Sequence, residues 1–153
     1  MLNNALITIF LAATPILEIR GALPVAIGVF ETPALLAYWL GVFGNMLPVI
    51  PLMLFWRYLV RFLMSRSQTA EIFFNWLFER TRIKIEKKIE KYGFLGLALF
   101  VAIPLPVTGA WTATIGAFVF GLPLRRSLFA ILLGVMIAGL IVLSLTYGLI
   151  FIV

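Results

Sequence analysis

The stretch 14-TPILEIRGALP-24 places two prolines, a glycine and two opposite charges inside an apolar segment that covers residues 1–31. Proline and glycine both disfavour a continuous helix. The legs on either side, residues 4–14 and 22–31, would each be ~16 Å long as helices, roughly half of a ~30 Å hydrocarbon core. We therefore predict that residues 1–31 form a re-entrant helical hairpin whose tip is broken by Pro15 and Pro24.

A second broken segment has the same layout. Residues 93–122 are apolar and contain 104-PLPVTG-109, which leaves legs 93–103 and 110–122 of about half the membrane thickness. This pattern predicts a second re-entrant hairpin, with Pro104 and Pro106 as its breakers. The alternative is that residues 93–122 cross the membrane once.

Two unbroken apolar runs predict helices that cross the membrane. Of the 153 residues, 63% are hydrophobic, and the mean hydropathy is +1.14. Residues 34–56 and 127–153 are 23 and 27 residues long without a charge, and about 20 apolar residues are enough to cross a bilayer. We assign the crossing helices to residues 34–64 and 124–153. Near the ends of the first helix lie aromatic residues typical of interfacial anchors: Tyr38, Trp39, Trp56 and Tyr58.

The distribution of positive charge distinguishes the two topologies. If both broken segments are hairpins, eleven of the twelve Lys and Arg residues lie on one side of the membrane. If residues 93–122 crossed, Arg125 and Arg126 would lie opposite nine of the others. Because positively charged loops stay in the cytoplasm, we predict a multi-pass protein of the cell (inner or plasma) membrane. Residues 57–92 and 123–126 are then cytoplasmic, and both termini lie outside.

The two halves then have opposite orientations and related sequences. The segments 14-TPILEIRGA-22 and 103-IPLPVTGA-110 both run from Pro to Gly-Ala, and LGV recurs at 40–42 and 133–135. Inverted repeats whose broken helices meet near the midplane are typical of transporters. The predicted fold is an all-α integral membrane protein with one domain, residues 1–153, in which a re-entrant hairpin followed by a transmembrane helix occurs twice.

Residues 68–92 join the halves and predict an amphipathic helix on the cytoplasmic surface. Its apolar residues recur on one helical face: Phe74, Phe78, Ile85, Ile89 and Tyr92. Basic side chains lie between them and suit anionic lipid headgroups. The candidates for surface lipid contact are Lys84, Lys87, Lys88 and Lys91. The alternative is a basic linker helix that only fixes the topology.

The composition argues against several other classes of protein. The chain has no His and no Cys, and all six acidic residues are Glu. This excludes His-based triads and disulfides, and it leaves little for a metal site. We expect no enzyme activity, no metal and no cofactor. The net charge of +6 suits cytoplasmic loops, and no basic-aromatic module indicates nucleic-acid binding.

Glu18 and Arg20 are the main functional candidates, because charges at membrane depth are costly and rarely face lipid. Arg20 keeps its proton and offers a planar donor fork to a phosphate or carboxylate, and helix N-termini at the breaks would also favour an anion. Glu18 is the one acid in the predicted membrane interior, which makes it the candidate proton carrier. A static salt bridge that fixes the hairpin tip is the alternative. Asn45 precedes Pro48 in a helix that is kinked either to line a site or for packing. Further candidates for a substrate and proton site are Gly21, Asn45, Thr108, Gly109 and Thr112.

The same residues carry a resemblance to a known family. Residues 15-PILEIRGALP-24 and 102-AIPLPVTGAW-111 resemble the two motifs of the small multi-drug export family, which is similar to the DedA/VTT group of re-entrant-hairpin proteins. The likeness covers nearly the whole chain. It implies transport of polyprenyl-phosphate or phospholipid carriers coupled to a proton gradient, with the acidic and Arg residues of the hairpins, here Glu18 and Arg20, taking part. The second hairpin departs from the DedA pattern, since Thr108 stands where an Arg is expected.

We therefore predict proton-coupled translocation of an anionic lipid carrier, such as a polyprenyl phosphate or a phospholipid, with membrane lipids as partners. The first alternative is a small multidrug exporter, although Arg20 would repel a cationic drug. The second alternative is a membrane scaffold without transport. We also expect a homodimer, because two crossing helices and two hairpins leave polar tips to be shielded from lipid. Gly134 and Ala138 form a small-residue face on which helices can meet.

Overall fold

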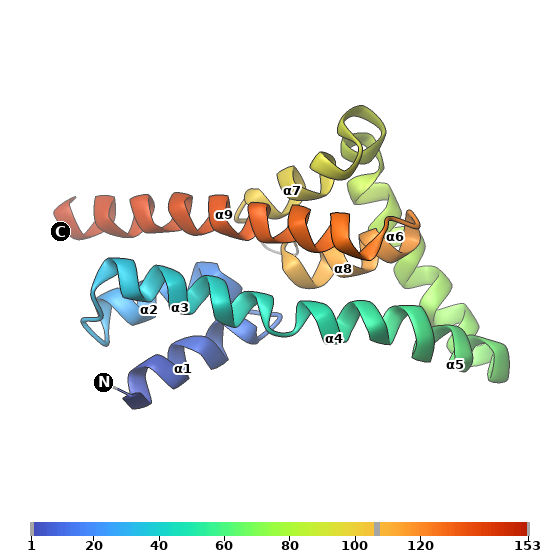
Figure 1. Ribbon diagram of the computed structural model, residues 1–153, viewed down its shortest axis with the longest axis horizontal. Coiled ribbons are helices and arrows are strands. Elements are labelled where there is room, and N and C mark those ends of the chain that lie inside the picture. Colours follow the sequence, from blue (N-terminus) through green and yellow to red (C-terminus); the bar gives the residue numbers. More distant parts are fainter. Residues whose placement is uncertain (1, 106–107, 153) are drawn as a thin grey trace.

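The computed structural model describes residues 2–105 and 108–152, and within these ranges every regular element is a helix (Figure 1). The prediction of an all-α chain is confirmed to this extent. The helices are α1 Leu2–Ala13, α2 Glu18–Gly28, α3 Ala34–Met46, α4 Val49–Leu54, the π-helix η1 Phe55–Val60, α5 Arg61–Arg66, α6 Gln68–Tyr92, α7 Phe94–Ala102, α8 Ala110–Val119 and α9 Leu124–Ile152.

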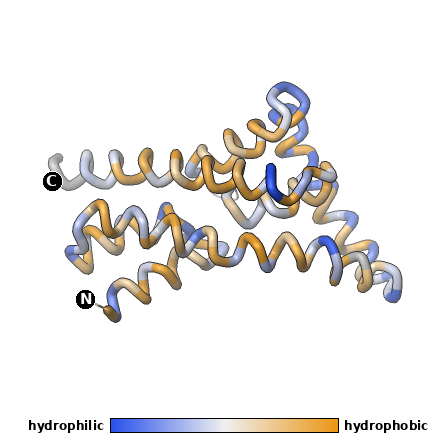
Figure 2. Tube along the Cα trace, in the orientation of Figure 1, coloured by the Kyte–Doolittle hydropathy of each residue, from blue (hydrophilic) through white to orange (hydrophobic). Residues whose placement is uncertain are grey.

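Two helical runs are long and apolar enough to cross a bilayer. One is Ala34–Arg66, which comprises α3, α4, η1 and α5, and the other is Leu124–Gly148 within α9. They extend along the length of the molecule and pack against each other through α3 and α9 (Figure 1). Figure 2 shows hydrophobic residues along both runs, whereas hydrophilic residues gather on α6 and at the start of α9. The sequence therefore identified both helices of membrane-crossing length.

The short helices form two pairs, and the first helix of each pair packs on one of the long helices at a glycine. A Cβ added to Gly44 of α3 would lie 2.5 Å from the Ile9 carbonyl oxygen of α1, and one added to Gly134 of α9 would lie 2.6 Å from the Ala98 carbonyl oxygen of α7. Glycine thus allows the backbones to touch in both halves. The α1–α2 pair lies toward the end of the molecule where α1 begins and α9 ends, and the α7–α8 pair lies toward α6 (Figure 1).

The first long helix is less regular than the single helix expected over residues 34–64. A turn at Leu47 and Pro48 separates α3 from α4, and the π-helix η1 follows six residues later. Pro48 has no N–H to donate, so the α-helical hydrogen bonding cannot continue through it. Pro51 lies inside α4 without ending it.

Helix α6 occupies the range in which the sequence places an amphipathic helix, but its predicted apolar face is turned mostly into the protein. Ile85 is fully buried, and the Phe78 ring contacts the tilted Phe118 ring of α8 with ring centroids 5.1 Å apart. Lys88 is half-buried, with its ammonium 5.4 Å from the centre of the Phe100 ring. A second set of apolar side chains on α6 is exposed: Ile72, Phe73, Trp76 and Ile83. The basic side chains Lys84, Lys87 and Lys91 are exposed as well.

Two of the four aromatic residues expected as interfacial anchors are core residues instead. Tyr38 is buried and its hydroxyl donates to the Met136 carbonyl of α9 at 3.0 Å. Trp56 is buried and its indole N–H donates to the Thr114 hydroxyl of α8 at 3.0 Å. These bonds satisfy their polar atoms and tie the first long helix to the second half of the chain. The remaining two, Trp39 and Tyr58, are exposed.

The small-residue face of α9 is filled within the chain. Gly134 contacts α7, and Ala138 is buried at 3% exposure. The helices that meet on this face therefore belong to the same chain, so the face is not available to a second copy. A homodimer stays a prediction, and its contact surface must lie elsewhere.

Candidate functional site

The breaks of the two helix pairs meet, and side chains from each break bond to the other. The indole N–H of Trp111 donates to the Ala13 carbonyl at 3.1 Å, and the Trp111 backbone N–H donates to Glu18 Oε1 at 3.4 Å. In the opposite direction, Arg20 Nη1 donates to the Leu105 carbonyl. Residues 85 to 98 positions apart in the sequence thus form one polar cluster.

Glu18 is the centre of this cluster. It is the first residue of α2, it is buried at 4% exposure, and its φ of +49° lies in the left-handed region. A non-glycine residue in that region costs roughly 1–2 kcal/mol, so the carboxylate is held by interactions that outweigh this cost. One of these interactions is the hydrogen bond from the Trp111 backbone N–H to the carboxylate. Trp111 is the second residue of α8, and the N-cap residue of that helix makes no capping bond with its own side chain. The Glu18 carboxylate therefore serves as a cap for the N-terminus of α8, which favours a negative charge.

Arg20 lies beside Glu18 but is closer to the surface. Arg20 Nη2 and Glu18 Oε2 are 3.4 Å apart, and the exposed fractions of the two side chains are 19% and 6%. Both residues lie on the first turn of α2, because this helix begins four residues before the predicted leg at residue 22. The prediction that they lie between the two helical legs, in the broken tip, was wrong in this detail. The left-handed Glu18 is what allows residues two apart on one turn to pair.

Gly109 provides the space that Glu18 occupies. Its φ is +157°, and a Cβ at this position would overlap the Glu18 carboxylate. Next to it, the Thr108 hydroxyl lies 2.8 Å from the carbonyl oxygens of both Ile103 and Leu105, to which it can donate. The second break is therefore shaped around the acidic side chain of the first, with its own hydroxyl used to close the turn.

Two cavities of different size lie on either side of the Glu18–Arg20 pair. The outer one, a groove of about 530 Å³, is bounded by Pro15, Ile16, Glu18, Arg20, Thr108, Trp111 and Thr112. The inner one, a chamber of about 10 Å³, lies between the two halves and is bounded on one side by Asn45 of α3 and on the other by Val135 and Ala138 of α9. Three residues line both the groove and the chamber: Glu18, Arg20 and Thr108.

Asn45 gives the inner chamber a polar wall. Its side chain is 1% exposed, and its Oδ1 has no hydrogen-bond partner among the described residues. An unpaired buried acceptor costs about 1–3 kcal/mol. The chamber is close to the ~10–15 Å³ that one water molecule requires, and such a water could bond Asn45 and reach Glu18. Asn45 and Glu18 therefore line the same chamber.

The remaining predicted residues differ in where the structure places them. Pro15 and Pro104 lie at the breaks and Thr112 lies in the first turn of α8, and all three line the cavities. Pro24 does not break the hairpin: it lies inside α2, which packs against α1, α3 and α9, and this packing outweighs the lost hydrogen bond. Gly21 lies one turn into α2, and the Leu17 side chain would be 2.8 Å from an added Cβ, which indicates a packing role. Pro106 is outside the described residues.

Sequence reasoning missed Trp111 and the carbonyl groups of Ala13 and Leu105. Trp111 supplies two of the hydrogen bonds described between the breaks. A Trp within an apolar hairpin must find an acceptor for its indole N–H, which is the signal that points to it. The carbonyl groups leave no mark in the sequence, since any residue supplies one. Within the described residues, no three acidic side chains gather into a possible metal site.

Comparison with known protein families gives a match. Residues 18–141 match the family model described as "Putative small multi-drug export protein". No curated protein and no solved structure matches the chain. The matched range begins at Glu18, directly after the first break, and includes the second break, the residues that line the inner chamber and the first part of α9.

Proposed function

The chain belongs to the small multi-drug export protein family, and from this premise we propose that it transports an anionic amphipathic molecule across the membrane, coupled to protons. A polyprenyl phosphate or a phospholipid has the required chemistry. Membership in the family and the two long apolar helices support a membrane export protein. The nature of the substrate and the coupling to protons rest on the site alone.

The observation that carries this proposal is which charge faces the groove. The Arg20 side chain is three times as exposed as that of Glu18, and the Glu18 carboxylate is held by Arg20 and by the start of α8. A ligand in the groove therefore meets a guanidinium, which binds phosphate or carboxylate through its planar fork. The apolar Ile16 and the Trp111 ring beside it suit a lipid-like body.

Proton coupling follows from competition for Arg20. While Glu18 is ionised it occupies Arg20, and a proton on Glu18 would release the guanidinium for an anion. By linkage, a proton on Glu18 and an anion on Arg20 each favour binding of the other. This arrangement favours transport of the anion together with a proton. The chamber beside Asn45 has room for about one water molecule, through which Glu18 could release its proton toward the second half of the chain.

We also propose that the α1–α2 and α7–α8 pairs are re-entrant hairpins of an inverted repeat, in line with the proposed kinship to the DedA/VTT group. Support comes from the matching glycine contacts of α1 on α3 and of α7 on α9, and from the opposite placement of the two pairs (Figure 1). In this topology residues 57–92, which include α6, and residues 123–126 are cytoplasmic. The chain lacks Cys, so single-Cys labelling tests it: Thr32→Cys should react from outside and Pro123→Cys from inside. Labelling of both from one face would contradict this topology.

The transport proposal is tested with purified protein in phosphatidylcholine vesicles that contain a fluorescent polyprenyl phosphate. We expect a proton gradient to drive translocation by the wild type, and we expect Arg20→Gln and Glu18→Gln to abolish it. Arg82→Gln is the matched control, because Arg82 pairs with Glu86 on the exposed surface of α6. Equal flux in all variants would contradict the proposal. Absence of flux in the wild type, with both site variants less stable, would favour a membrane scaffold.

Export of small drugs is the second candidate, and the description of the family favours it directly. The groove is large enough for a small molecule, but a cation would have to approach Glu18 past Arg20. Drug resistance in cells separates the two candidates. Resistance to cationic drugs that disappears in Glu18→Gln and persists in Arg20→Gln would establish this second function, whereas the anion proposal predicts no such resistance.

A further inference from the structure

The π-helix η1 presents Arg57 to a cleft at the far end of α8 from the groove. A π-helical segment changes the register of the side chains that follow it and occurs often at functional sites. Here Trp56 points into the core and bonds to Thr114, while the neighbouring Arg57 is exposed. The cleft has a volume of about 220 Å³ and lies between η1, α8 and the turn into α9.

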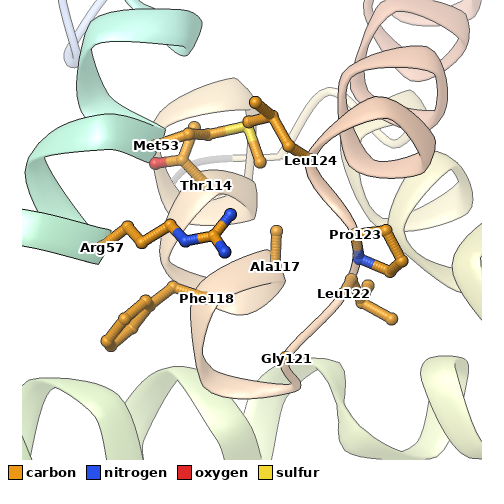
Figure 3. A pocket seen from close by; sticks show the side chains of 9 residues that line it. All are labelled: Met53, Arg57, Thr114, Ala117, Phe118, Gly121, Leu122, Pro123 and Leu124. Atoms are coloured by element: carbon orange, nitrogen blue, oxygen red, sulfur yellow. The ribbon is translucent and has the colours of Figure 1, made fainter.

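Arg57 is the only charged residue among those that line this cleft. Figure 3 shows its guanidinium reaching from η1 toward Ala117, with Leu122 and Pro123 on the opposite side. Both ion pairs found within residues 2–105 and 108–152 lie elsewhere, so Arg57 has no carboxylate partner in the described part of the chain. A guanidinium has five donors and is always charged. The cleft thus contains an unneutralised cation among mostly apolar side chains.

The polar groups of the wall do not supply the missing partner. The Thr114 hydroxyl donates to the Trp111 carbonyl at 2.7 Å and accepts from Trp56. The backbone N–H groups of Gly121 and Leu122 donate to carbonyls of α8 at 3.1 and 2.9 Å. An incoming anion would therefore bind Arg57 without displacing a bond that the structure already makes.

We propose that this cleft binds the phosphate headgroup of an anionic membrane lipid, at a site separate from the groove of Glu18 and Arg20. The phosphate meets Arg57, and apolar side chains exposed on the same long helix take the upper part of the acyl chains. Leu54 and Leu59, three residues before and two residues after Arg57, are exposed in this way. The site does not depend on transport: it is defined by binding, and the proposed transport activity can fail without affecting it.

The test measures lipid binding to the purified full-length chain in neutral detergent, by thermal stabilisation and by native mass spectrometry. Phosphatidylglycerol should stabilise the wild type and stay bound, whereas phosphatidylcholine, which carries no net charge, should not. We expect Arg57→Gln to weaken phosphatidylglycerol binding about ten- to hundred-fold, the range of a lost charge-assisted hydrogen bond. The phosphatidylglycerol affinity of Arg57→Lys should lie between those of the wild type and Arg57→Gln, because lysine keeps the charge but lacks the planar donor fork.

Two controls separate this site from other basic surfaces. Arg125→Gln removes an exposed charge at the same end of the molecule that does not line the cleft, and it should bind as the wild type does. Arg20→Gln can remove only lipid that is bound in the groove, so it should retain the phosphatidylglycerol binding that Arg57→Gln weakens. Unchanged binding in Arg57→Gln, or an equal loss in Arg125→Gln, would overturn the proposal. Competition by inorganic phosphate at concentrations equal to those of the lipid would also overturn it, in favour of a site for the free anion.

Discussion

The substitution Gly109→Ala tests whether the second break is shaped around Glu18. The added Cβ would overlap the carboxylate, so either Glu18 or the start of α8 must move. Overpacking of this kind costs about 1–3 kcal/mol. If the movement also breaks the bond from Trp111 to Glu18, the cost rises, because a hydrogen bond to a charged group contributes roughly 1.5–3 kcal/mol.

A double-mutant cycle isolates this effect. In a Glu18→Ala background the Cβ has room, so Gly109→Ala should cost less there, and we expect a coupling energy of about 1–3 kcal/mol. The strain of alanine at φ +157° is present in both backgrounds and cancels. The unpaired Arg20 is likewise common to both variants that lack Glu18.

The measurement is thermal unfolding of the purified chain in detergent. For a chain of this length, about 1 kcal/mol corresponds to a shift of roughly 2–4 °C. Gly28→Ala is the matched control, since no atom lies within 4 Å of a Cβ at that position, and it should change stability by less than about 0.5 kcal/mol. An equal cost of Gly109→Ala in both backgrounds would show that Glu18 does not fill the space beside Gly109.

Three further substitutions test the packing around the site by the same unfolding assay. Ile85→Ala should lower the free energy of unfolding by about 2–5 kcal/mol, because Ile85 is fully buried. Ile83, on the same helix, is 68% exposed, so Ile83→Ala should have little effect. Equal effects would mean that α6 does not pack on the protein through the face that contains Ile85. Gly134→Ala should cost about 1–3 kcal/mol because its Cβ would meet the α7 backbone, and Gly148→Ala, with open space around it, serves as its control. Tyr38→Phe should cost about 0.5–1.5 kcal/mol through the lost bond to α9, and a neutral result would argue that α3 and α9 are not joined there.

The sequence was sufficient where the physics is local. Long runs without charge identified the two helices of crossing length, and Pro15 and Pro104 marked both breaks. It was insufficient where a distant partner decides. The sequence around Glu18 does not indicate that α2 begins there. The carboxylate of this left-handed residue is bound by the backbone N–H of Trp111, which is 93 positions away. The same holds for Tyr38 and Trp56, whose positions near the helix ends suggested the interface, while their acceptors lie on α9 and α8.

Arg57 was overlooked for a related reason. In the sequence it is one of nine basic residues within 57–91, and the rule that positive charge sets orientation accounts for all of them together. Only the π-helical register of η1 and the turn between α8 and α9 distinguish it from the rest. A basic residue that helps to set the orientation in the membrane can therefore also bind an anion in a particular cleft.

Helix α8 connects the features on which both proposals depend. Its first turn is capped by Glu18 and borders the groove through Trp111 and Thr112, while Thr114 borders the Arg57 cleft, only a few residues further along. A proton on Glu18 would weaken the cap of α8 and the pairing with Arg20 at the same time. Loss of one charge would then both open Arg20 to an anion and loosen the contact between the two helix pairs. In an inverted repeat that alternates access by movement of one half against the other, the bond between Glu18 and α8 is where binding of the ligand and movement of the halves would be coupled.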